Sequence, residues 1–140
     1  MNSLKRLLFE YNEEPSELDA SVKVLITRKG DGFYSKVSHI FSQHGEAFLD
    51  LDSRRIIIDG EEADNENWSN EHFLFVQAHE IAHLRLKHTP ENRDETMADC
   101  WAILYLADKG YKEAAKLGIQ QFKYRNGMTF KEYRKKINGK

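Results

Sequence analysis

The chain has 140 residues, a formal net charge of −2 and 40% hydrophobic residues. This length suits one domain with a single core, and the charge argues against a general binder of polyanions. The one cysteine excludes a disulfide within the chain, and no apolar run approaches the roughly 18 residues of a membrane span. The first 15 residues include three glutamates and are unlike a signal peptide, so we expect a cytoplasmic protein with no membrane association.

The first half of the chain predicts a helix followed by a small sheet. Apolar residues at helical spacing predict a short helix over residues 4–11, and alternation predicts a strand over residues 22–27. Residues 33–43 suit either a helix or a strand. Residues 47–59 predict a β-hairpin around Asp52 and Ser53, and residues 60–70 predict a polar, acidic loop.

The second half predicts helices. In residues 71–88 apolar side chains cover nearly the whole circumference, which predicts a buried central helix. A second apolar helix is expected from Asp94 to about Lys109, and a weaker one from Lys112 to about Phe122. A turn is expected at residues 125–127, with a last helix starting at Met128 or Thr129. The fold class is therefore α+β, with a small, mostly antiparallel sheet and its hairpin packed on a helical layer.

The most informative motif is His79-Glu80-Ile81-Ala82-His83, an HExxH sequence on the predicted central helix. Residues four apart lie one above the other on a helix, so both imidazoles can bind one metal ion. Glu80 points roughly 100° away from His79, where it can reach a metal-bound water rather than the metal. This pattern predicts a zinc-dependent hydrolase, most simply a peptidase, with Glu80 as the general base. The alternative is a helix with structural histidines and a solvated Glu80.

A catalytic zinc usually has three protein ligands, and two residues are candidates for the third. On a continuous helix His88 lies about 180° from His79, and residues 84–87 contain no glycine or proline that would turn it back. We therefore expect His88 to be a residue at the end of the helix, near the terminal carbonyl groups.

Glu95 is the better candidate for the third ligand, with Asp99 as its neighbour four residues later. A hairpin of helices would place both carboxylates opposite the two histidines. One carboxylate can bind zinc while the other accepts the N–H group of a ligating histidine. The alternative is a capping box with Asn92 as N-cap and Glu95 at the third helical position, which leaves Asp99 without a role.

The elements at residues 79–83 and 95–99 together resemble the gluzincin metallopeptidases, in which HExxH is followed by ExxxD or ExxAD. Their short separation and the segment at residues 55–59 are similar to the ImmA/IrrE-type metallopeptidases. The resemblance covers about residues 47–106.

The resemblance implies one zincin-like metallopeptidase domain over residues 1–140, with Glu95 as third zinc ligand and Asp99 as the outer partner of a ligand. It also implies an intracellular regulatory protease that cleaves a transcriptional repressor. Two positions depart from the family pattern: Ala82 replaces a glycine, and Asp99 replaces an asparagine. Neither departure removes a ligand.

Three further features have two interpretations each. His72 lies within about 20° of the helix face of His79, so it can line a cleft or simply begin the helix at the surface. Cys100 is expected to pack inside the second helix, with a thiolate ligand as the alternative. Residues 123–140 contain seven Lys or Arg and one acid; we expect a solvated surface rather than a nucleic-acid site.

The expected partner is a protein or peptide substrate. The edge of the hairpin at residues 47–59 can bind it by strand addition, unless that edge is covered. No residue stands out as the donor to the oxyanion. Two other classes stay open. One is a structural or interaction protein, part of a larger assembly, with zinc as a structural element. The other is a zinc hydrolase that acts on non-peptide substrates.

Overall fold

The computed structural model describes residues 13–89 and 92–139. The chain divides into two compact units, Met1–Trp68 and Ser69–Lys140, and its elements give an α+β protein as predicted. The helix expected at residues 4–11 lies outside the described residues. Organisation as a single domain stays a prediction.

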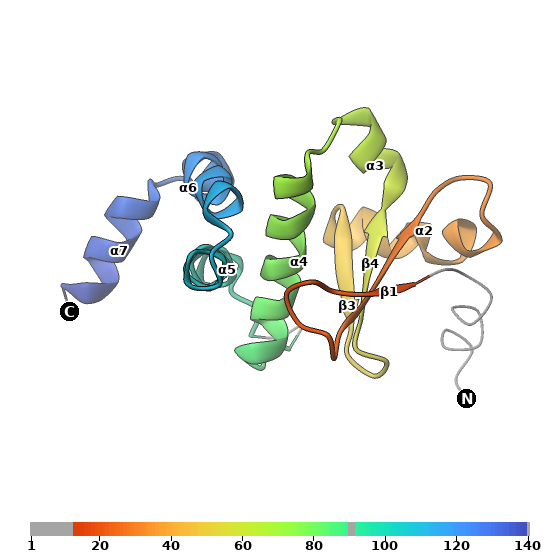
Figure 1. The fold of residues 1–140 in the computed structure, drawn as a ribbon, viewed down its shortest axis with the longest axis horizontal. Helices are drawn as coiled ribbons and strands as arrows, with labels where there is room; N and C mark the ends of the chain where they lie inside the picture. Colours follow the sequence, from red (N-terminus) through yellow and green to blue (C-terminus); the bar gives the residue numbers. More distant parts are fainter. Residues whose placement is uncertain (1–12, 90–91, 140) are drawn as a thin grey trace. The chain divides into compact units, whose positions relative to one another are not determined.

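A mixed sheet of four strands forms the centre of the first unit, in the order β1-β2-β4-β3 (Figure 1). The strands are β1 Glu14–Pro15, β2 Lys23–Thr27, β3 Ala47–Asp50 and β4 Arg55–Asp59. The predicted hairpin is the antiparallel pair of β3 and β4, and β1 is antiparallel to β2. The central pair, β2 and β4, is parallel, because a helix and β3 intervene and return the chain in the same direction. Strand β3 lies at an edge of this sheet, and addition of a peptide there stays a prediction.

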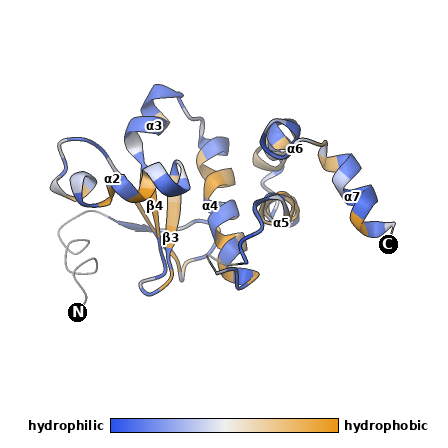
Figure 2. Cartoon of the chain, turned by 180° about the vertical axis from the view of Figure 1, so that it is seen from behind, coloured by the Kyte–Doolittle hydropathy of each residue, from blue (hydrophilic) through white to orange (hydrophobic). Residues whose placement is uncertain are grey.

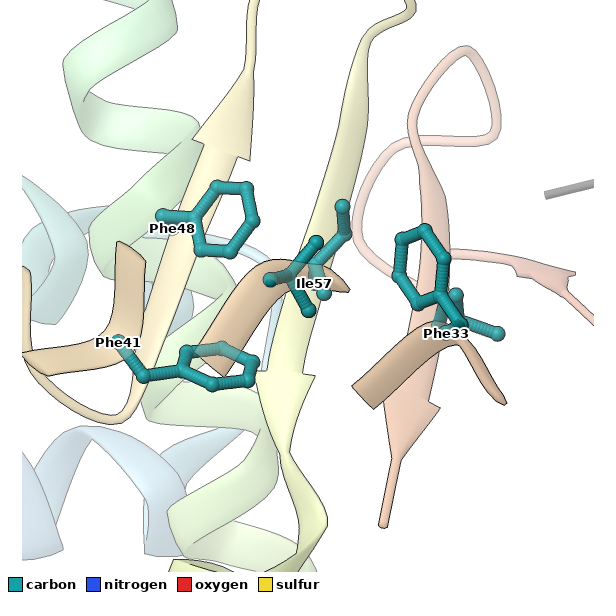
Figure 3. Packing of buried hydrophobic residues seen from close by; sticks show 6 residues of the cluster. Phe33, Phe41, Phe48 and Ile57 are labelled. Carbon is teal, nitrogen blue, oxygen red and sulfur yellow. The ribbon is translucent and has the colours of Figure 1, made fainter. Parts of the chain in front are cut away.

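The ambiguous segment at residues 33–43 is helical, as part of α2, Gly32–His44. Phe33, Val37 and Phe41 recur every four residues and are buried, whereas Ser35 and His39 between them are exposed. All five would share one face of a strand, so this pattern suits a helix. They pack with Leu25 of β2, Phe48 of β3 and Ile57 of β4 to form a core in this unit (Figure 3).

The predicted loop at residues 60–70 was partly wrong, because it contains a short helix, α3, Gly60–Asn65. Its N-cap is Asp59, whose side chain accepts hydrogen bonds from the backbone N–H groups of Glu61 and Glu62. Acidic residues in a first turn also interact well with the helix dipole. A polar helix of six residues has too little hydrophobic periodicity to be recognised from sequence.

The second unit contains α4 Asn70–Arg85, α5 Glu95–Asp108, α6 Lys112–Asn126 and α7 Phe130–Asn138. Helices α4, α5 and α6 pack on one another, and α7 contacts α6. Every residue from Phe75 to His83 is buried, so the predicted central helix is confirmed. Figure 2 shows apolar residues along α4, whereas α7 is mostly hydrophilic. No helix among the described residues is long and apolar enough to cross a membrane.

Helix α6 lies very close to its neighbours at Gly118. A Cβ atom at this position would lie 2.7 Å from a ring carbon of Phe75 on α4 and 2.8 Å from a side-chain carbon of Ile103 on α5. Only glycine fits there without movement of the neighbouring side chains. The contact fixes α6 against both helices that carry the HExxH and ExxAD elements.

The end of α6 lies further along the chain than predicted. We expected a helix to about Phe122 and a turn at residues 125–127, but the helix includes Arg125 and Asn126. It ends at Gly127, which has the left-handed conformation with φ of 80°. Both residues therefore lie on the last turn of a helix, in fixed positions.

Candidate metal centre

Three side chains of the second unit converge on one point: His79 and His83 of α4, and Glu95, the first residue of α5. The Nε2 atoms of the two histidines are 3.1 Å apart. Glu95 Oε2 lies 3.0 Å from His79 Nε2, and Glu95 Oε1 lies 3.1 Å from His83 Nε2. Tetrahedral coordination with bonds of about 2.0–2.1 Å separates ligand atoms by about 3.3 Å, so this spacing suits a metal ion.

Two imidazoles and a carboxylate form a donor set that zinc favours at sites where one position is left for water. The histidine side chains are only 6% and 3% exposed, whereas Glu95 is 52% exposed. The cluster is therefore held in the interior by α4 and reaches solvent on the side of Glu95.

The local sequence explains how Glu95 reaches the histidines. Asp94 is the N-cap of α5, and its side chain accepts a hydrogen bond from the backbone N–H group of Met97. The predicted alternative, with Asn92 as N-cap, is wrong, since the side chain of Asn92 accepts from the backbone N–H group of Thr89. Glu95 is thus free of any capping function and lies in the first turn, where the helix dipole favours its negative charge.

Asp99 contacts the outer side of the cluster. It is 1% exposed, and its Oδ1 lies 2.6 Å from Nδ1 of His79, the nitrogen that faces away from the cluster. Two residues of α6 also bind it: Arg125 Nε donates to Oδ2 at 2.8 Å, and Asn126 Nδ2 donates to Oδ2 at 2.9 Å. Asp99 therefore connects α4, α5 and α6, in the position expected for the outer partner of a ligating histidine.

Arg125 and Asn126 were missed by the sequence interpretation. They follow Asp99 by 26 and 27 residues, a separation at which no local pattern links them. The side chain of Asn126 is itself oriented by Thr96, whose hydroxyl group donates to Asn126 Oδ1 at 3.0 Å. The available sign was a basic residue, Arg125, two positions before the glycine that ends α6.

The charges around the cluster shift the pKa values of its members in opposite directions. Burial by itself lowers the pKa of His79, but the carboxylates of Asp99 and Glu95 outweigh it and raise that pKa to about 9. Burial lowers the pKa of His83. Burial would raise the pKa of Asp99, but its contacts with His79 and Arg125 lower it. Without a metal, His79 therefore carries a proton at neutral pH and His83 does not.

Glu80 and Arg93 lie together beside the cluster. Glu80 is 4% exposed and follows His79 directly in α4. Arg93, in the segment before α5, has Nη2 at 3.7 Å from Glu80 Oε1, and its Nε donates to Glu95 Oε1. A cation thus lies between the candidate general base and the candidate third ligand. Sequence reasoning missed Arg93 because an isolated arginine in a loop belongs to no motif.

His88 lies at the end of α4 near the terminal carbonyl groups, as expected, because its backbone N–H group donates to the carbonyl oxygen of His83. The expectation that its side chain lies on the face opposite His79 was wrong. Helix α4 ends at Arg85 rather than continuing to residue 88, and Lys87 has a left-handed backbone with φ of 58°. This turn brings Nδ1 of His88 to 2.8 Å from Nδ1 of His83. His88 is therefore on the side of the site, although it touches the outer nitrogen of His83 and lies outside the set of ligand atoms.

The two remaining candidates, His72 and Cys100, lie outside the ligand cluster. His72 lies in the first turn of α4, where its backbone N–H group donates to Ser69 Oγ at 3.2 Å, as expected for a residue at a helix start. Cys100 is buried on α5, as predicted, and burial raises the pKa of its thiol. In the described part of the chain neither residue belongs to the ligand cluster.

Comparisons with protein-family models, with curated proteins and with solved structures found no match to this chain. The functional argument therefore rests on the geometry of the residues named above.

Proposed function

We propose that this chain is a zinc-dependent metallopeptidase of the gluzincin type with a zincin-like fold, and that His79, His83 and Glu95 hold its single zinc ion. The observation that carries the proposal is the convergence of these residues: the two histidine Nε2 atoms lie 3.1 Å apart, and each lies 3.0–3.1 Å from a different oxygen of the Glu95 carboxylate. Two imidazoles of one helix and a carboxylate of the next meet at metal-ligand separations, and a buried carboxylate lies beside them.

Zinc, when bound, supplies a Lewis acid that polarises a carbonyl group and lowers the pKa of a bound water to about 7. Glu80 accepts the proton of the attacking water and later passes it to the leaving amine. Its position on α4, next to His79 in sequence and inside the protein, keeps it at the reacting atoms without making it a ligand. Asp99 holds His79 in the orientation that directs Nε2 toward the metal.

Arg93 is the donor to the oxyanion, which the sequence did not identify. Before the reaction the negative charge lies on Glu80, 3.7 Å from the guanidinium group. Once Glu80 has accepted a proton, that charge has moved to the oxygen of the former carbonyl group. A fixed cation that faces both Glu80 and Glu95 stabilises the new charge, as donors of an oxyanion hole do.

The decisive variant is Glu80→Gln, which keeps the size of the side chain and removes the base. Zinc content should match that of the wild type, while turnover of a peptide library falls at least about 100-fold. The matched control is Glu71→Gln in the first turn of the same helix, which should leave turnover unchanged.

Two outcomes would contradict the proposal in different ways. If zinc-loaded wild type cleaves no peptide and Glu80→Gln behaves identically, zinc is a structural element of an interaction protein. If wild type hydrolyses small acyl esters or amides that Glu80→Gln does not, and leaves peptides intact, the chain is a non-peptide zinc hydrolase.

A further inference from the structure

The two histidines proposed as ligands each have an outer contact, but of different kinds. Nδ1 of His79 faces a carboxylate, that of Asp99. Nδ1 of His83 faces another imidazole, with Nδ1 of His88 at 2.8 Å and the ring centroids 5.0 Å apart. The role of His88 is not explained by the ligand set or by the proposed reaction.

The backbone holds His88 in this place. Its N–H group donates to the carbonyl oxygen of His83 at 2.9 Å, and the N–H group of Lys87 donates to that of Leu84 at 3.2 Å. These two bonds, with Lys87 in the left-handed conformation, are those of a Schellman motif. The motif closes the end of α4 and joins the backbones of the same two residues whose side chains meet.

The positions of the nitrogen atoms determine which one carries a proton. His83 Nε2 faces the cluster, 3.1 Å from His79 Nε2 and 3.1 Å from Glu95 Oε1, so it is the atom available to a metal. A neutral imidazole that binds a metal through Nε2 carries its proton on Nδ1. Because the two Nδ1 atoms are within hydrogen-bond distance, Nδ1 of His88 must then be the acceptor. His88 consequently carries its own proton on Nε2.

We propose that His88 is a positioning residue of the metal centre, whose Nδ1 accepts a hydrogen bond from Nδ1 of His83 and fixes the tautomer and orientation of that ligand. This inference rests on the proposed zinc site. It gives each ligating histidine an outer partner, a carboxylate for His79 and a neutral acceptor for His83. A neutral acceptor orients the ring without adding a further negative charge next to Glu95 and Glu80.

Three substitutions of His88 separate an acceptor from a space-filling side chain. In His88→Asn the amide oxygen stands as many bonds from Cα as Nδ1 does, so it can accept the same hydrogen bond. In His88→Gln the polar atoms lie one bond further out, and His88→Leu has no acceptor. The full chain is titrated with Zn²⁺ against a chromogenic chelator. We expect His88→Leu to bind zinc about 10–100-fold more weakly than wild type, with His88→Asn within about threefold of it.

The Nδ1 proton of His83 provides a second readout that a purely structural role would not change. In the zinc-loaded protein, nuclear magnetic resonance should detect it as a slowly exchanging downfield proton in wild type and His88→Asn, and not in His88→Leu. Lys87→Gly, which adopts the left-handed turn without strain, is the control and should bind zinc like wild type.

Equal zinc affinity and the same proton signal in wild type and His88→Leu would overturn the inference while leaving the proposed function intact. Weak binding by His88→Asn, equal to that of His88→Gln, would also overturn it, because His88 would then act by shape alone. That comparison decides the question even if the leucine variant does not fold. A wild-type chain that binds no zinc would refute the proposed function itself.

Discussion

Replacement of Asp99 by asparagine should lower both the stability of the metal-free chain and its affinity for zinc, and the two effects can be measured separately. The side chain keeps its size but loses its charge. Asp99 is 1% exposed and binds His79 of α4 together with Arg125 and Asn126 of α6. The sequence predicted for it only the role of outer partner of a zinc ligand. Its contacts with α6 add an effect on the stability of the metal-free chain.

The expected size of each effect follows from these contacts. Removal of one partner from a buried ion pair costs about 3–5 kcal/mol. Arg125 is 27% exposed, so water hydrates part of its charge, and we expect the lower end, about 3 kcal/mol. The loss of the outer partner of His79 should weaken zinc binding about 10–100-fold, which corresponds to about 1.4–2.7 kcal/mol.

Urea denaturation in the presence of a chelator measures the first effect, and competition with a zinc chelator measures the second. Asp108→Asn, an exposed acid at the end of the same helix, is the matched control and should change the free energy of unfolding by less than about 0.5 kcal/mol. The double variant Asp99→Asn with Arg125→Met should recover part of the stability, since it removes the uncompensated cation. Unchanged stability of metal-free Asp99→Asn would refute the assignment of Asp99 as the connection between α4, α5 and α6.

Three further predictions concern zinc, packing and charge. The pKa of about 9 for His79 and the lowered pKa of His83 mean that zinc binding at pH 7 displaces about one proton. The apparent affinity for zinc should therefore rise about tenfold per pH unit up to about pH 9. Calorimetry in buffers of different ionisation enthalpy measures the number of protons released when zinc binds. A release of no proton or of two protons would contradict this prediction. Gly118→Ala should lower the melting temperature despite a gain in helix propensity of about 1 kcal/mol, because its Cβ atom meets Phe75; a higher melting temperature would show that α6 can move away. The basic C-terminal helix should give no salt-dependent micromolar binding of labelled DNA or RNA in fluorescence anisotropy; binding that Lys135→Glu abolishes would refute that expectation.

Parts of the site that depend on one helix or on its cap could be predicted from sequence. The spacing of four residues between His79 and His83 determines that they share a face of α4, and the same spacing applies to Glu95 and Asp99 on α5. Apolar residues around the whole of α4 indicated burial correctly. In each case the geometry follows from regular helical dihedral angles.

Other parts depend on backbone conformations or distant contacts that a single sequence does not reveal. The turn that returns His88 to His83 uses a left-handed lysine, where sequence rules look for glycine. Arg125 and Asn126 reach Asp99 from α6, a helix that lies very close to α4 and α5 at Gly118. The first feature is a local backbone conformation and the second is a set of tertiary contacts. Neither can be predicted from the pattern of hydrophobic residues.

The position of Arg125 also changes the design of one test. Removal of residues 123–140 would be the simplest way to examine the basic C-terminus, but it would delete both side chains of α6 that bind Asp99. A loss of function in that truncated protein would then report damage to the metal centre. Charge reversals in α7 avoid this problem, because they leave Arg125 and Asn126 in place; α7 packs on α6 through the rings of Phe130 and Tyr133 against Phe122.

The most direct test of the metal centre is native mass spectrometry of the zinc-loaded wild-type chain beside Glu95→Ala, with Glu113→Ala on α6 as a control. We predict about one zinc ion per chain in wild type and in the control, and a loss of most zinc in Glu95→Ala under the same conditions. A wild-type chain without zinc, or full retention of zinc by Glu95→Ala, would contradict the assignment of His79, His83 and Glu95 as its ligands.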